Sequence, residues 1–117
     1  MCHRGHYPGR GFIQTLILWI IHKEPLHGYG VRKEIEQMAS HYTPKSGAIY
    51  TILRRMEKNG LLTSRWNQRT GKKDIRIYHV TEKGEDLLRA RLEIMKDRLK
   101  LLEQMVSYYH SKIAREK

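Results

Sequence analysis

The residue types in this chain best suited to catalysis or metal binding are its seven histidines and its single cysteine. The histidines are scattered, and no pair has the spacing of a metalloprotease site. No serine or cysteine lies in the context of a catalytic nucleophile, and Gly9-Arg10-Gly11 lacks the spacing of a phosphate loop. We therefore expect no enzyme, no cofactor and no built metal site. Cys2, His3 and His6 could together bind a soft metal, although a flexible tail explains them more simply.

Basic residues suggest a different chemistry, because they are concentrated in one segment. Between residues 45 and 76, nine lysines and arginines stand against two acidic residues, so this segment carries +7 of the net charge of +11. A solvated surface with surplus lysine is one interpretation. A charge block confined to one segment favours the other, which is contact with a polyanion.

Length and hydropathy place the chain among small globular proteins. Its 117 residues give room for one domain and one appendage. The longest apolar stretch, residues 12–21, is about half as long as a membrane span. The first residues lack a secretory cleavage site, and a lone cysteine agrees with a reducing compartment. We expect a cytoplasmic protein with no membrane partner.

The first expected helix, residues 12–23, is apolar on nearly all sides. It should end at Glu24-Pro25, because the residue before a proline leaves helical geometry. A helix that is apolar all round must be buried all round. In so small a domain this indicates cover from a second surface, most simply another subunit.

Two further helices and a hairpin follow. Residues 30–40 and 46–59 show apolar residues at helical spacing, and Ser46, or Thr43 before a proline, is expected to cap the later helix. Asn59-Gly60 is expected to end that helix, and Thr81 to cap the last helix. Residues 62–68 and 74–80 are rich in β-formers around a basic tip, which predicts a two-stranded hairpin. This order predicts a mainly α (α+β) fold, the winged helix-turn-helix. We divide the chain into an arm at 1–11, a winged-helix domain at 12–81 and a C-terminal dimerisation helix at 82–117.

The last helix carries apolar residues in strict heptad phase, with Leu92, Leu99, Val106 and Ile113 at one seam position. A second apolar column beside this seam indicates that the helix touches both a partner's copy and the first helix. An apolar space between them is the expected seat of a small hydrophobic effector, with a fully packed core as the alternative. Trp66 is expected in the core. The predicted dimer-interface residues are Phe12, Leu16, Trp19, Leu88, Leu92, Met95, Leu99, Leu102, Val106, Tyr109 and Ile113.

The third helix of a helix-turn-helix enters the major groove of DNA. Arginine can pair with guanine there, whereas lysine, tyrosine and the free amides of residues 46–48 suit phosphates. The hairpin tip suits the minor groove or its phosphates. The residues predicted from this geometry to contact DNA are Lys45, Ser46, Gly47, Tyr50, Thr51, Arg54, Arg55, Lys58, Arg69, Lys72 and Lys73.

Three motifs together resemble the PadR family of transcriptional regulators. They are Pro25-Leu26-His27-Gly28-Tyr29-Gly30, Ser46-Gly47-Ala48-Ile49-Tyr50 with the following residues 53–62, and Tyr78-His79-Val80-Thr81-Glu82-Lys83-Gly84. The single C-terminal helix is similar to the compact branch of that family. The resemblance implies a winged-helix dimer, mostly a repressor, that binds inverted repeats and is released by a ligand. It also implies that Tyr29, Ser46, Gly47 and Tyr50 contact the DNA backbone or support those contacts.

We therefore expect a sequence-specific, dimeric DNA-binding regulator that binds double-stranded DNA at an inverted repeat. One alternative is an architectural protein that coats DNA without sequence preference. A second is a metal-responsive regulator that uses Cys2, His3 and His6, and a third is a protein-interaction module that docks through its last helix. The basic hairpin tip argues against the third.

Overall fold

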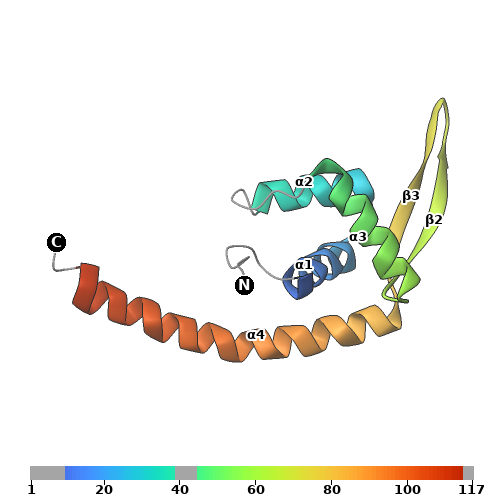
Figure 1. Ribbon diagram of the computed structural model, residues 1–117. Coiled ribbons are helices and arrows are strands. Elements are labelled where there is room, and N and C mark those ends of the chain that lie inside the picture. Colours follow the sequence, from blue (N-terminus) through green and yellow to red (C-terminus); the bar gives the residue numbers. More distant parts are fainter. Residues whose placement is uncertain (1–9, 39–44, 115–117) are drawn as a thin grey trace.

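The computed structural model describes residues 10–38 and 45–114. A three-helix body carries a hairpin at one end, and a long helix leaves the body and continues well beyond it (Figure 1). The longest dimension is 62 Å, about twice each of the other two, 30 and 28 Å. The elements in chain order are α1 (Arg10–Lys23), β1 (Leu26–His27), α2 (Gly28–Met38), α3 (Ser46–Lys58), β2 (Leu62–Arg69), β3 (Lys72–Val80), α4 (Glu82–Tyr108) and a π-helical turn (Tyr109–Ile113).

The sheet confirms the predicted hairpin and adds a strand to it. β2 and β3 pair in antiparallel register from Leu62↔Val80 to Arg69↔Lys72, with an irregularity near the tip. Gly71 has a positive φ of 70° in the turn, a conformation that glycine adopts without strain. The short β1 pairs with β3 through Leu26↔Tyr78 and His27↔Ile77, so the strand order is β1-β3-β2. Two residues are too few for sequence periodicity to predict a strand, and β1 was missed.

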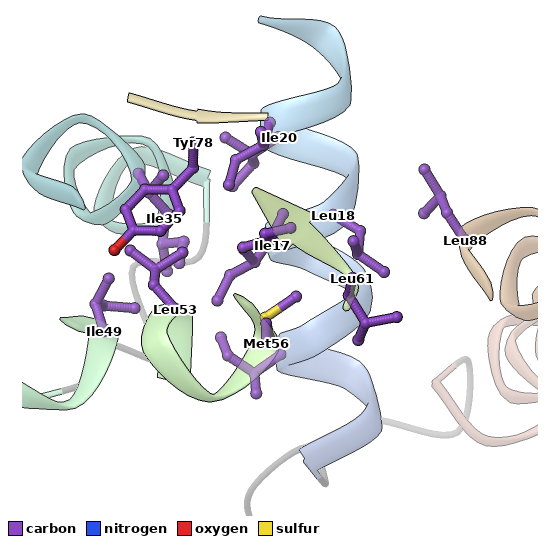
Figure 2. Close-up of a cluster of buried hydrophobic side chains, with 14 residues drawn as sticks. Ile17, Leu18, Ile20, Ile35, Ile49, Leu53, Met56, Leu61, Tyr78 and Leu88 are labelled. Atoms are coloured by element: carbon purple, nitrogen blue, oxygen red, sulfur yellow. The ribbon is translucent and has the colours of Figure 1, made fainter. Parts of the chain in front are cut away.

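The core lies where α1, α2 and α3 meet the base of the sheet. Figure 2 shows Ile49, Leu53 and Met56 of α3 among side chains of α1 and α2, with the Tyr78 ring from β3 beside them. Ile17, Ile35 and Leu53 have no solvent-exposed area. The buried face of α3 is therefore the one predicted from helical spacing, and its opposite face is left for solvent or a ligand. On α2, Val31 and Ile35 are buried as predicted, whereas Met38 is 41% exposed.

The end of α3 fixes where the hairpin begins. Gly60 has a φ of 82°, its N–H donates to the Glu57 carbonyl at 3.0 Å, and the Leu61 N–H donates to the Met56 carbonyl at 2.9 Å. This pair of bonds is the Schellman motif, which satisfies carbonyls at a helix end. The Asn59-Gly60 stop predicted from the sequence is thereby confirmed.

The first two turns of α4 belong to the body. The Thr81 side chain accepts the Gly84 N–H at 3.0 Å, which confirms it as the N-cap of this helix. A Cβ at Gly84 would collide with the Leu61 carbonyl, so only glycine allows this close approach. Leu88 is only 6% exposed and joins the core. The prediction that Leu88 belongs to the dimer seam is therefore wrong, because the helix is still packed on its own subunit at this position.

Several boundaries differ from the sequence predictions by one or two residues. α1 begins at Arg10, so the arm predicted to run to residue 11 ends sooner, and α2 begins at Gly28 where 30 was expected. The N-cap of α3 is Lys45 without a side-chain cap bond, so Ser46 is the first helical residue and not the cap. Thr43, the alternative cap, lies outside the described residues. Among the residues described, no helix is both long and apolar enough to cross a bilayer.

Candidate nucleic-acid interface

The face of α3 opposite the core is basic and exposed. Arg54, Arg55 and Lys58 are all exposed, and they lie on the side away from Ile49 and Leu53. Lys45, Gly47, Tyr50 and Thr51 are also exposed, whereas the side chain of Ser46 lies outside the described part of the chain. The third helix therefore presents the predicted side chains together on one surface.

A glycine–tyrosine contact sets the angle between α2 and α3. The Tyr50 ring lies directly over Gly28, and a Cβ at that position would collide with the ring. Glycine at the start of α2 thus lets the two helices approach, and Tyr50 supports the position of α3. The neighbouring Tyr29 is 51% exposed, with the Lys33 ammonium 5.7 Å from its ring centroid. The Tyr50 ring and Tyr29 therefore both lie at the beginning of α2.

The N-terminus of α3 offers fewer free amides than predicted. The Ala48 N–H donates to the Lys45 carbonyl at 2.9 Å, which closes the first turn. It is therefore not available to a phosphate, and the prediction of three free amides at residues 46–48 is wrong for this one. The amides of Ser46 and Gly47 precede that first bond of the helix.

The hairpin tip is held by one of its own arginines. The Arg69 guanidinium donates from Nε and Nη2 to the Lys73 carbonyl, at 3.1 and 2.9 Å. Lys72 and Lys73 are exposed beside it. Arg69 therefore shapes the tip, and the two lysines are the cations that the tip presents to its surroundings.

A pair formed by an exposed tryptophan and a half-buried arginine on the hairpin was not predicted. Trp66, expected in the core, is 62% exposed, and every residue of β2 after Ser64 is exposed as well. Arg76 stands opposite it in the β2–β3 register, with its guanidinium carbon 5.1 Å from the ring centroid. Tryptophan content alone cannot distinguish a core residue from a projecting one. Strand alternation does not distinguish them either, because Trp66 shares a face with Ser64 and with the buried Leu62.

The other large exposed surface is apolar and lies on the far part of α4. We call it the α4 apolar face, and it continues into the π-helical turn that follows α4. Its exposed members are Leu92, Leu99, Leu102, Val106, Tyr109 and Ile113, and the half-buried Met95 lies among them. Leu99 is 55% exposed, and the exposed apolar side chains around it form a continuous patch, which is rare on a monomeric protein. On α1, Phe12 and Trp19 are exposed too, so α1 is not buried all round within one chain, and Leu16 packs partly against the core.

A groove of about 580 Å³ runs along this face. It is lined by Phe12 of α1 and by α4 residues that include Leu92, Leu99 and Leu102. Nearby, Arg91 fastens α1 to α4, because its guanidinium donates to the Gly11 carbonyl at 2.8 Å and to the Thr15 hydroxyl at 3.1 Å. The groove therefore lies where the body ends and the free part of α4 begins.

The residues described contain no group of three or more histidine, cysteine, aspartate or glutamate side chains that could hold a metal ion. Cys2, His3 and His6 lie outside the described residues, so the structure says nothing about a metal site in the arm.

Comparison with known proteins identifies the family. Residues 17–90 match the family described as "Transcriptional regulator PadR-like family". The chain belongs to this family. The matched region runs from α1 to the beginning of α4, so it contains the whole basic end of the molecule and excludes most of the α4 apolar face.

The curated relatives are longer than this chain. The chain is 34% identical over 101 residues to "Transcriptional regulator YqjI" of Escherichia coli, covering 83% of this chain and 47% of that protein. The same figures hold for a YqjI protein of Shigella flexneri. This PadR-like chain thus spans about half the length of the curated relatives it matches.

Solved structures share the fold over most of the chain. The smu.1704 protein of Streptococcus mutans aligns with a TM-score of 0.74 at 27% identity, over 87% of this chain and 93% of that one. A PadR family regulator of Clostridium difficile gives 0.72 at 25% identity, over 81% and 98%. Bacillus subtilis PadR, solved in complex with operator DNA, gives 0.64 at 24% identity, over 69% and 46%. The predicted winged-helix fold and family resemblance are confirmed.

Proposed function

We propose that this PadR-like chain is a homodimeric, sequence-specific DNA-binding regulator that works in the cytoplasm as a ligand-responsive repressor. The observation that carries the proposal is the separation of its two exposed surfaces. Basic side chains of α3 and the hairpin occupy one end, and the α4 apolar face occupies the other. A two-fold dimer through the apolar end leaves both basic ends free for DNA.

DNA is the polyanion that fits the basic end. α3 has a row of exposed cations on one face, and an α-helix fits the width of the major groove. We assign Arg54 and Arg55 to base edges, and Lys45, Lys58, Lys72 and Lys73 to phosphates. Bacillus subtilis PadR, which shares the fold, was solved with operator DNA. That complex supports the same use of this surface here.

A second copy of the chain is the occupant that fits the apolar end. The exposed leucines of the α4 apolar face repeat every seven residues, which is the pattern of a helix that packs on a parallel or antiparallel copy of itself. Phe12 and Trp19 extend this surface onto α1. Because two recognition helices related by a two-fold axis meet two half-sites, the DNA site is expected to be an inverted repeat.

The groove beside Phe12 is our proposed seat for a small hydrophobic effector. A ligand bound there touches α4 and the start of α1, and it can therefore change how two bodies are spaced across a dimer. Titrating the DNA complex with organic cations, and separately with zinc, nickel or copper, tests this against regulation through the arm. If organic cations release DNA equally from the full chain and from a variant lacking residues 1–9, the result supports an effector site in the groove. If a metal releases DNA from the full chain but not from the shortened variant, the result supports regulation through metal binding by the arm. If no titrant changes the affinity for DNA by about tenfold, or about 1.4 kcal/mol, the effector proposal is wrong.

Selection of DNA sites from a random library tests the main proposal. We expect an inverted repeat that binds at least about a thousandfold more tightly than random DNA at the same salt concentration. An architectural DNA-coating protein gives no enriched sequence and a ratio near one. Because both kinds of protein neutralise phosphates, the ratio of affinities separates them, whereas the salt dependence alone does not.

A further inference from the structure

The β2–β3 hairpin has two faces, and one of them is directed toward α3. Side chains alternate along a strand, so Trp66 shares a face with Ser64, and Arg76 shares that face with Tyr78. Ser64 donates a hydrogen bond of 2.8 Å to the Glu57 carboxylate of α3, and Tyr78 is buried in the core. The Trp66–Arg76 pair is the next step of the ladder on this face, nearer the tip. The pair therefore lies between α3 and the lysines of the hairpin tip.

The Arg76 guanidinium lies near the Trp66 ring and forms no salt bridge with a carboxylate among the residues described. Its carbon lies 5.1 Å from the Trp66 ring centroid, and its Nε is buried without a hydrogen-bond partner among the residues described. The salt bridges found in residues 10–38 and 45–114 do not include it, although Asp74 follows on the same face. Nearby, Arg69 donates to a carbonyl. Arg76 is thus a cation held by an aromatic ring with no carboxylate paired to it.

We propose that Arg76, held in place by the exposed Trp66, binds a DNA phosphate between the groove occupied by α3 and the contact made by the hairpin tip. This rests on the proposed function, because a duplex that touches both α3 and Lys72 must pass over this face. Guanidinium is planar and well suited to phosphate, and stacking on an aromatic ring limits its rotamers before binding. Trp66 is then a positioning residue whose free ring edge contacts the sugar of the same nucleotide.

Salt dependence measures the phosphate contact. Arg76→Gln should weaken binding to the selected DNA about tenfold and make the plot of log affinity against log salt shallower. Removing one phosphate contact changes that slope by about 0.9, and a two-fold dimer carries the substitution twice, so the expected change is about double. Arg89→Gln removes the same charge from an exposed position on α4 and should leave the slope unchanged. Trp66→Ala should behave like Arg76→Gln, whereas Trp66→Phe keeps a ring and should restore most of the affinity.

Fluorescence separates the positioning role from a merely structural one. The chain has two tryptophans, so Trp19→Phe leaves Trp66 as the only emitter and Trp66→Phe leaves Trp19. Saturating DNA should change the emission of Trp66 strongly and that of Trp19 little. Thermal unfolding of Trp66→Ala, Trp66→Phe and Arg89→Gln should match the wild type, since Trp66 and Arg89 are mostly exposed.

The results distinguish failure of this proposal from failure of the function on which it rests. If the wild type binds selected DNA while Arg76→Gln matches Arg89→Gln in affinity and slope, the phosphate contact is overturned. An unchanged Trp66 emission at saturating DNA overturns the role of Trp66. If the wild type binds no DNA sequence, the proposed function is wrong, and this inference is wrong as a consequence.

Discussion

The hairpin and the far part of α4 both project from the body, but their side chains are held in different ways. On the hairpin, contacts within the chain fix the polar groups: Arg69 bonds to the Lys73 carbonyl, Arg76 lies on Trp66, and Ser64 bonds to Glu57. Beyond Leu92, the α4 apolar face has no comparable support, and about half of each leucine surface is exposed. A projecting hairpin with polar side chains can be ordered while it is surrounded by water. A projecting helix with an exposed apolar face indicates a surface that another chain covers.

The strongest test of this comparison is a charge in the centre of the α4 apolar face. Leu99→Asp should abolish the dimer, because burying an unpaired carboxylate costs several kcal/mol. Sedimentation at micromolar concentration should show a dimer for the wild type and a monomer or unfolded chain for the variant. Gln104→Asp, at an exposed position of the same helix outside the apolar face, is the matched control and should stay dimeric. A folded, monomeric wild type would contradict the dimer.

Leu88 separates the part of α4 that belongs to the body from the part that projects. Leu88→Ala should lower the free energy of unfolding by about 2–5 kcal/mol, since it opens a cavity in the core. Leu102→Ala, a matched truncation on the α4 apolar face, should act mainly on the dimer. Denaturant titration at several protein concentrations measures both effects. If the destabilisation of Leu88→Ala disappears at high concentration, Leu88 belongs to the interface after all.

The recognition helix should show base preference. Arg54→Ala or Arg55→Ala should cost about 1–3 kcal/mol on the selected site and relax the preference at one base pair in each half-site. Competition binding with selected and random DNA provides the measurement. Equal reductions in affinity on the two DNAs would favour the architectural protein over the specific regulator.

The smallest effect is expected at the tip. Lys72→Ala should weaken binding to all sequences alike, because an exposed lysine offers a phosphate only a point charge. The salt slope should fall by at most about 0.9 for each of the two subunits. Binding isotherms across a salt series measure this. A change in sequence preference would place Lys72 at a base edge instead.

Sequence patterns predicted the helices and the hairpin because each has a local cause. Helical spacing located the buried side of α3, the Asn59-Gly60 pair located its end, and Thr81 located the start of α4. The errors arose where position depends on distant parts of the chain. Leu88 fits the heptad as well as Leu92 does, and only the docking of α4 on α1 separates them. Likewise, Trp66 lies on the exposed outer part of β2, and residue type alone does not predict how far a hairpin projects from the body.

For the candidate interface, the sequence predicted which residues carry charge and could not predict how each charge is used. Arg69 and Arg76 are equivalent in a count of basic residues. In the fold, one closes the hairpin tip and the other lies on an aromatic ring. Hydrogen-bond geometry and strand register make this distinction, and neither follows from residue type.

The bond from Arg69 to the Lys73 carbonyl has a consequence for conformational entropy. Ordering a loose tip during DNA binding would cost about 1–2 kcal/mol for each residue fixed, which would offset much of what two lysine–phosphate contacts contribute. With Gly71 already in its turn and Arg69 already bonded across it, that ordering takes place when the chain folds. The hairpin tip is then already ordered when it binds DNA, so its small electrostatic contribution to the binding free energy is not offset by an ordering cost.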